Sequence, residues 1–219
     1  MKQQKTALGG YEFTAFLPEE RADCAVYIPM HGTAEEIWRM LPGCRAALIS
    51  VSGFDWNKDL SPWPAKAVFG DEDFSGGADA FLHDLIRLIP DVEREAGIAP
   101  ARRGIAGYSL AGLFAVYAAY RCDVFTRVAS VSGSMWYDGW LDFARQNPLA
   151  APVDRAYFSV GAKEKKTRNV RMAAVEDCTR AMNDLFSDRG AESLFELNPG
   201  NHFVDADLRM AKAIRFPTE

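Results

Sequence analysis

Apolar segments of strand length alternate with segments of helical periodicity along most of this chain, and this alternation restricts the fold more than any other feature. The predicted strands are residues 11–17, 24–30, 46–52, 104–107, 128–132, 156–161 and 193–198. The predicted helices are residues 79–96, 110–121, 168–187 and 205–215. Because strands with two apolar faces need cover on both sides, the sequence predicts an α/β architecture with a mostly parallel central sheet and helices on both of its faces.

The length of the chain and its distribution of charge limit the functional classes. A chain of 219 residues, of which 48% are hydrophobic and 25% charged, predicts a single globular domain over residues 1–219. The net charge is −5 and the two signs are interspersed, which argues against a nucleic-acid partner. Every apolar run is of strand length, so we expect no membrane span.

The cysteines and the first residues bear on metal binding and location. Cys24, Cys44, Cys122 and Cys178 are far apart and have no CxxC or Cys/His spacing. We therefore expect them to pack as small buried apolar residues, and we expect no metal and no cofactor. Residues 1–10 carry charge but no apolar stretch, unlike a secretory leader, so a cytoplasmic location is the expectation.

A Gly-Tyr-Ser-Leu-Ala-Gly segment at residues 107–112 follows a predicted strand and opens a predicted helix. This is the context of the nucleophile elbow, a tight turn that presents a serine hydroxyl and requires small residues two positions before and after the serine. Gly107 and Ala111 meet that requirement, although alanine replaces the usual second glycine. Alone, the motif fits a helix-capping Ser109 equally well, and its place in the alternating chain favours a nucleophile. The Leu110 amide is then a candidate oxyanion donor.

A nucleophilic serine needs a base, and the chain has three histidines. His83 lies within the first predicted helix and is expected at the surface. His31 follows the second predicted strand, where the loop of an α/β-hydrolase supplies an oxyanion amide, so Gly32 and Thr33 are candidate backbone donors and His31 is structural. His202 lies in a turn-rich loop between the last strand and the last helix, and the order serine, acid, histidine is that of this fold. His202 is therefore the predicted general base.

The acid that orients the histidine should follow a strand between Ser109 and His202. Glu164 comes shortly after the predicted strand 156–161 and is the leading candidate. Its basic neighbours also fit the solvated start of a helix, so the alternative acid is Asp138, in the loop after the predicted strand 128–132.

Several segments, taken together and in order, resemble one family. They are His31-Gly32, the helix from Phe81-Leu82 to Leu88-Ile89-Pro90, residues 107–112, residues 131–136, residues 161–164 and Gly200-Asn201-His202. The chain from about Val26 to Ile214 resembles the putative-esterase family of α/β-hydrolases, which includes enterochelin esterases, feruloyl and acetylxylan esterases and S-formylglutathione hydrolase. The resemblance implies catalytic roles for Ser109, Glu164 and His202, and no cofactor.

The chain is too short for a separate lid domain between its strands, so an open site is expected. Its predicted walls are the loop at residues 54–77 and the aromatic residues Trp136, Tyr137 and Trp140, each of which fits the core equally well. The leading function is hydrolysis of a small-molecule carboxylic ester by a serine esterase. Short acyl, aromatic acyl, acetylated sugar and siderophore esters all stay open, as does the oligomeric state. The alternatives are acyl transfer by the same triad, or a binding protein that has lost activity.

Overall fold

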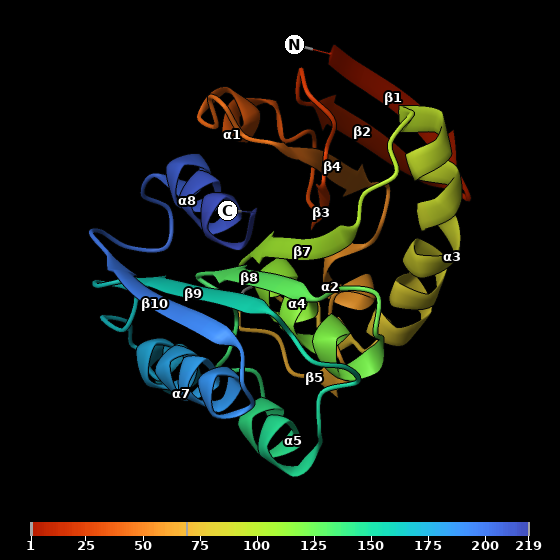
Figure 1. The fold of residues 1–219 in the computed structure, drawn as a ribbon. Helices are drawn as coiled ribbons and strands as arrows, with labels where there is room; N and C mark the ends of the chain where they lie inside the picture. Colours follow the sequence, from red (N-terminus) through yellow and green to blue (C-terminus); the bar gives the residue numbers. More distant parts are fainter. Residues whose placement is uncertain (1, 69, 219) are drawn as a thin grey trace.

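The computed structural model describes residues 2–68 and 70–218, and across them the chain forms an eight-stranded sheet with the order β1-β2-β4-β3-β7-β8-β9-β10 (Figure 1). Its strands are β1 (Lys2–Leu8), β2 (Tyr11–Leu17), β3 (Cys24–Pro29), β4 (Ala46–Ser52), β7 (Arg102–Tyr108), β8 (Arg127–Val131), β9 (Arg155–Gly161) and β10 (Glu192–Asn198). Neighbouring strands from β4 to β10 in this order are parallel, whereas β2 is antiparallel to β1 and to β4. The predicted, mostly parallel sheet is confirmed.

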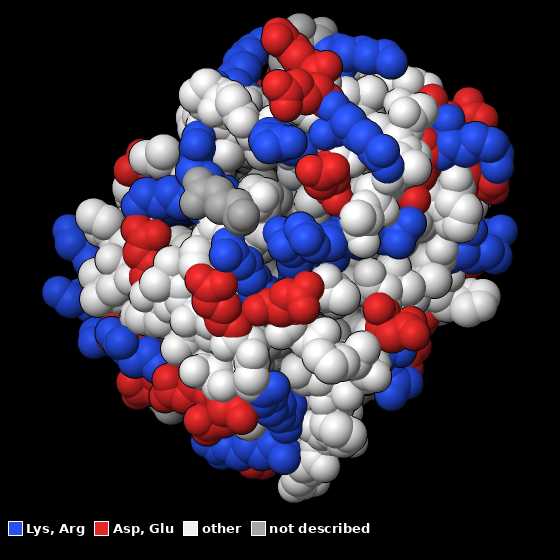
Figure 2. All heavy atoms as spheres, in the orientation of Figure 1, with Lys and Arg blue, Asp and Glu red and all other residues white. Residues whose placement is uncertain are grey.

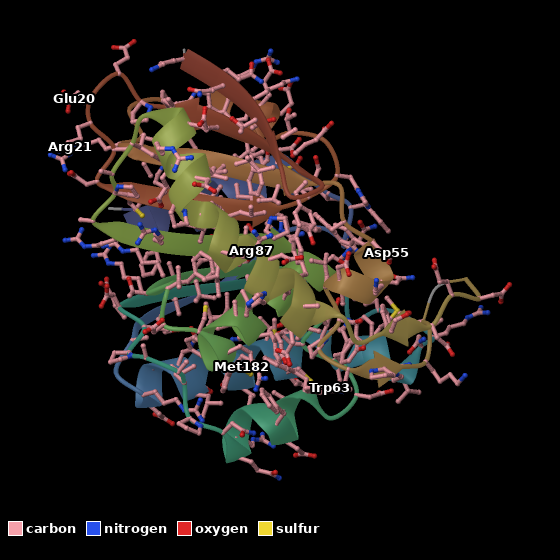
Figure 3. All side chains as sticks on the ribbon, turned by 90° about the vertical axis from the view of Figure 1, so that its right-hand side faces the viewer. Glu20, Arg21, Asp55, Trp63, Arg87 and Met182 are labelled. Carbon is pink, nitrogen blue, oxygen red and sulfur yellow. The ribbon has the colours of Figure 1, made fainter. Side chains whose placement is uncertain are left out.

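Helices cover both faces of this sheet (Figure 1). One face carries α3 (Ala78–Ala96), α4 (Leu110–Arg121), α5 (Trp140–Gln146) and α7 (Val175–Asp188), and the other carries α1 (Glu35–Arg39) and α8 (Ala206–Thr218). In Figure 3 the first of these helices, α3, faces the viewer with Arg87 labelled. The shorter elements are α2 (Trp56–Asp59), β5 (Pro64–Ala65), β6 (Phe74–Ser75) and α6 (Val170–Ala173).

Strand β3 illustrates why the sheet needs cover on both faces. Ala25 and Tyr27 pack into the core beneath α3 and α4, whereas Val26 and Ile28 pack into the core beneath α1 and α8. Successive side chains of a strand point to opposite faces, so a continuous apolar run places an apolar surface on each. The same burial fixes the register, because a slip of one residue would exchange the two sets.

Some elements differ from the sequence-based prediction. The predicted helix at residues 168–187 is divided into α6 and α7, with Ala174 between them. The predicted loop at residues 54–77 contains α2 and the short β5–β6 hairpin, and β1 and α5 were not predicted. The apolar spacing of the last helix also predicts one buried face formed by Leu208, Ala211 and Ile214; Ala211 and Ile214 of α8 are buried as predicted, but Leu208 is 47% exposed.

The surface and the helices bear on the expected partners. No helix within residues 2–68 and 70–218 is both long and apolar enough to cross a bilayer. Figure 2 shows acidic and basic side chains intermixed over the face that it displays, as the sequence led us to expect.

Candidate active site

Ser109 occupies a strained turn between β7 and α4. Its φ of 59° and ψ of −124° lie in a region that non-glycine residues rarely adopt, at a cost of about 1–3 kcal/mol. The turn is also crowded, because a Cβ placed on Gly107 would lie 2.1 Å from the carbonyl oxygen of Ala111. Only glycine fits at residue 107, and the small side chain of Ala111 is tolerated two positions after the serine. This is the local geometry that the motif predicted.

Ser109, His202 and Glu164 form one continuous line of hydrogen bonds. The Ser109 hydroxyl lies 3.2 Å from Nε2 of His202, and Nδ1 of His202 lies 2.8 Å from Oε2 of Glu164. The three residues follow β7, β10 and β9, whose carboxyl ends meet at one edge of the parallel sheet. A carboxylate on Nδ1 fixes the tautomer in which Nε2 is free to accept the serine proton.

Glu164 is held in place by several donors. Its side chain is only 5% exposed, and its Oε1 accepts hydrogen bonds from the Gly161 amide at 2.6 Å and the Ser132 hydroxyl at 2.5 Å. Burial alone raises the pKa of the Glu164 carboxyl, but the hydrogen bonds from His202, Ser132 and Gly161 outweigh burial and lower it below its ordinary value. Glu164 is therefore a stable carboxylate facing the imidazole.

Arg209, from α8, lies behind this carboxylate and was not predicted. Its side chain is 2% exposed, and Nη2 donates to the Ser132 hydroxyl and to Oε1 of Glu164 at 3.2 Å. Nη1 donates to the Tyr108 hydroxyl at 3.0 Å, and Tyr108 in turn donates to the backbone carbonyl of His202. Arg209 thus links the strand that precedes the serine, the acid and the loop of the base. An arginine among the apolar residues of the last helix was the only available sequence signal.

The alternative acid lies outside this network. Asp138 is about half exposed, and its Oδ1 pairs with Nε of Arg171 at 2.9 Å. The guanidinium of Arg171 also covers the ring of Trp136, with 5.5 Å between Cζ and the ring centroid. Asp138 therefore makes a peripheral ion pair, and the geometry favours Glu164.

The loops that carry Glu164 and His202 are tied together. The Lys163 amide donates to the Gly200 carbonyl at 2.9 Å, and the Ala162 amide donates to the Asn198 carbonyl at 2.8 Å. A Cβ on Gly161 would lie 2.8 Å from the Gly200 oxygen and 2.9 Å from Oε1 of Glu164. This close approach requires glycine, and it sets the relative position of acid and base.

The proposed oxyanion donors occupy two places at the same edge of the sheet. Leu110 is the first residue of α4, where backbone amides have no carbonyl partner from a preceding turn. Gly32 and Thr33 follow β3, the parallel neighbour of β7, and Gly32 has a φ of 81°. His31 stacks on Phe54 with ring centroids 5.8 Å apart, in keeping with a structural role.

Two small hollows open on either side of Ser109. The base-side hollow, of about 150 Å³, is lined by Ser109, Ser134, Trp136, Lys163, Glu164, Lys166, Met172, Val175, Asn201, His202 and Phe203. The elbow-side hollow, of about 70 Å³, is lined by Trp56, Asn57, Val68, Glu72, Phe74, Ser109, Leu110, Ser134 and Trp136. A larger hollow of about 550 Å³ near Trp38 and Arg45 contains none of the three hydrogen-bonded residues. The two hollows that share Ser109 are therefore the candidate substrate sites.

The predicted aromatic wall is corrected by the structure. Trp136 lines both hollows, as expected, but Trp140 is fully buried and packs on Tyr120 and Phe143. Tyr137 is also buried, and its hydroxyl donates to the Trp63 carbonyl. Trp140 turns inward because it begins α5, a short helix that the sequence analysis missed. The predicted loop wall does contribute, through the residues of the elbow-side hollow.

The described part of the chain contains no cluster of three or more His, Cys, Asp or Glu side chains arranged to hold a metal ion. The four cysteines have no disulfide partner; Cys24 is buried, and Cys44, Cys122 and Cys178 are half-buried. Burial raises the pKa of the Cys24 thiol to about 11, so this thiol is an unreactive packing group.

A parallel sheet covered by helices, with a serine on a strained strand–helix turn hydrogen-bonded to histidine and carboxylate, defines the α/β-hydrolase class. The model of the family described as putative esterase matches residues 46–206. This chain therefore belongs to the putative esterase family, which confirms the resemblance seen in the sequence.

Individual relatives are more distant. An uncharacterised protein of Bacillus subtilis strain 168, YbbA, is 27% identical over 148 residues, which cover 65% of this chain. The chain spans 59% of the length of YbbA. A siderophore hydrolase of Aspergillus nidulans, EstB, has a TM-score of 0.71 at 18% identity, with 99% of this chain and 95% of EstB covered. An IroE-like serine hydrolase of Shewanella oneidensis has a TM-score of 0.76 at 15% identity, with 98% and 79% covered. These likenesses confirm the predicted fold.

Proposed function

We propose that this protein is a single-domain, serine-dependent carboxylic-ester hydrolase that acts through an acyl-enzyme. The observation that carries the proposal is the continuous hydrogen-bonded line from Ser109 through His202 to Glu164. Membership of the putative esterase family supports it, as do structural neighbours described as siderophore and enterobactin hydrolases. The substrate is accordingly a small-molecule ester.

The reaction proceeds in two halves. His202 Nε2 accepts the Ser109 proton as the serine oxygen attacks the ester carbonyl, and the same proton passes to the leaving alkoxide when the ester bond breaks. A water molecule then enters, gives a proton to His202 and attacks the acyl-enzyme. Collapse of that second intermediate returns the proton to Ser109 and releases the carboxylic acid.

The negative charge that develops on the carbonyl oxygen needs preorganised donors. The Leu110 amide, at the start of α4, is the first proposed donor, and the Gly32–Thr33 backbone is the second. Such a donor contributes about 3–4 kcal/mol to transition-state stabilisation in enzymes of this kind. No metal or cofactor has a role in this chemistry.

The proposal is tested with a fluorophosphonate probe and a panel of aryl esters. The wild-type protein should become labelled at Ser109 and should hydrolyse at least one ester of the panel. Ser109→Ala should lose labelling and lower kcat on the order of a million-fold, while the melting temperature changes little. A wild-type protein that neither reacts with the probe nor turns over any ester would instead be a binding protein with a hydrolase fold.

A further inference from the structure

The two hollows at Ser109 receive different parts of an ester. His202 delivers its proton to the leaving oxygen, so the alcohol part of the substrate must extend on the side of His202, into the base-side hollow. The acyl part stays attached to Ser109, and its remaining substituent extends past Leu110 into the elbow-side hollow. This assignment rests on the proposed function.

The base-side hollow has an uncompensated positive charge. Lys163 and Lys166 line it. Among the described residues, neither lysine has a carboxylate oxygen within 4 Å of its amino group, so neither forms an ion pair. Lys165, between them, differs, because its amino group pairs with Glu176 at 2.9 Å. The Glu164 carboxylate does not neutralise the hollow, since it is buried against His202 and Arg209.

The elbow-side hollow has the opposite character. Trp56, Val68 and Phe74 give it apolar walls. Among the described residues that line it, Glu72 is the one with a charged side chain. The side chain of Asn57 donates to the Glu72 backbone carbonyl at 3.3 Å, which holds this residue at the rim. An anionic acyl group would therefore meet a like charge in this hollow.

We propose that the substrate is an ester whose alcohol part carries an anionic group such as a carboxylate, and whose acyl part is apolar. Lys163 and Lys166 recognise the anion beyond the scissile bond, and Glu72 excludes negative charge from the acyl side. Because both lysines are exposed to solvent, each contributes a modest attraction that salt weakens. We expect a preference of roughly three- to ten-fold in kcat/KM for the anionic alcohol part at low ionic strength.

The experiment compares two acetate esters that differ in charge on the alcohol side, 4-acetoxybenzoate and 4-acetoxybenzamide. The wild-type enzyme should prefer the benzoate, and the preference should shrink as salt is added. In the double variant Lys163→Gln, Lys166→Gln, the ratio of the two kcat/KM values should fall to about one. The matched control is Lys165→Gln, which removes a charge from the same loop outside the hollow and should keep the wild-type ratio.

The acyl side is tested with phenyl hexanoate and the monophenyl ester of adipic acid. Wild type should prefer the neutral hexanoate, and Glu72→Gln should reduce this preference. If wild type hydrolyses both acetate esters equally well, through Ser109, the proposed esterase function stands and the charge assignment is overturned. If no ester is hydrolysed by a route that requires Ser109, the proposed function fails and the charge assignment fails with it.

Discussion

Positive φ angles at non-glycine residues of the described chain occur around the proposed triad of Ser109, His202 and Glu164. Ser109, Ser132 and Asp205 are the non-glycine residues with positive φ among residues 2–68 and 70–218. Ser109 and Ser132 directly follow β7 and β8, and Asp205 ends the loop that carries His202. Such conformations persist only where surrounding contacts compensate their cost, and here the contacts are those of the proposed triad. The strain at Ser132 places its hydroxyl on Glu164.

At the residue scale, the candidates that the sequence offered most clearly lie on recognisable turns. The elbow motif selected Ser109, and chain order together with position after a strand selected His202 and Glu164 as candidates. It could not separate Glu164 from Asp138, because the direction of a loop carboxylate depends on its partner, here Arg171 for Asp138. Arg209 could not be predicted either, since its hydrogen-bond partners come from four other segments of the chain.

The acid assignment gives a direct mutational prediction. Glu164→Gln should lower kcat by about three to four orders of magnitude with KM little changed, because an amide supports the wrong imidazole tautomer. Asp138→Asn is the matched control and should stay within a few-fold of wild type. Rates should be compared on the plateau of the wild-type pH–rate profile, so that protonation of the base does not affect the comparison. If kcat falls strongly in Asp138→Asn and stays near wild type in Glu164→Gln, Asp138 is the acid of the triad.

Single elements were predicted best where the apolar pattern was strong. The helix α4 has the predicted bounds, residues 110–121, and is buried on nearly all sides. The strand β1 was missed because its Lys and Gln side chains carry no apolar alternation, as befits an exposed edge of the sheet. The short helix α5 was missed because its first residue, Trp140, was interpreted as part of a site wall.

The burial of Trp140 gives a prediction at the level of α5. Trp140→Phe should lower the free energy of unfolding by about 1–3 kcal/mol and leave kcat and KM for aryl esters near wild type, because the ring packs in the core. Trp136→Phe is the matched comparison, and it should change KM more than stability, because Trp136 lines both hollows. Chemical denaturation and steady-state kinetics of the two variants would separate these outcomes. A raised KM for Trp140→Phe would show that Trp140 contacts the substrate after all.

The last helix is predicted to stabilise the site through one side chain. Arg209→Met should cost about 3–5 kcal/mol of unfolding free energy, since it removes the buried cation that pairs with Glu164 and the donor to the Ser132 and Tyr108 hydroxyls. The control on the same helix is Lys212→Met, whose partly exposed ion pair with Glu196 should be worth less than about 1 kcal/mol. Urea unfolding measures both losses. Equal decreases in the free energy of unfolding of the two variants would show that Arg209 stabilises the fold no more than a surface ion pair does.

For the whole molecule, the lowered pKa of Glu164 couples folding to pH. The folded state prefers the ionised form, so the associated stability is present above the ordinary glutamate pKa of 4.5 and is lost as pH falls through the lower folded value. The stability difference between wild type and Glu164→Gln should therefore be constant near neutral pH and shrink below about pH 4.5. Titrating carboxylates elsewhere cancel in this difference, and urea unfolding at several pH values measures it. A difference that grows on acidification would reverse the sign of the pKa shift.

The position of Arg209 also bears on when the proposed triad is completed during synthesis of the chain. All three residues of the proposed triad have been translated once His202 is added, yet the guanidinium that backs the acid arrives seven residues later and docks only with α8. A nascent chain that ends before α8 carries the reactive serine without the clamp that aligns its partners. If the proposed triad is catalytic, we expect hydrolysis to begin only after α8 has packed on the sheet, so that folding of this last helix sets when activity appears.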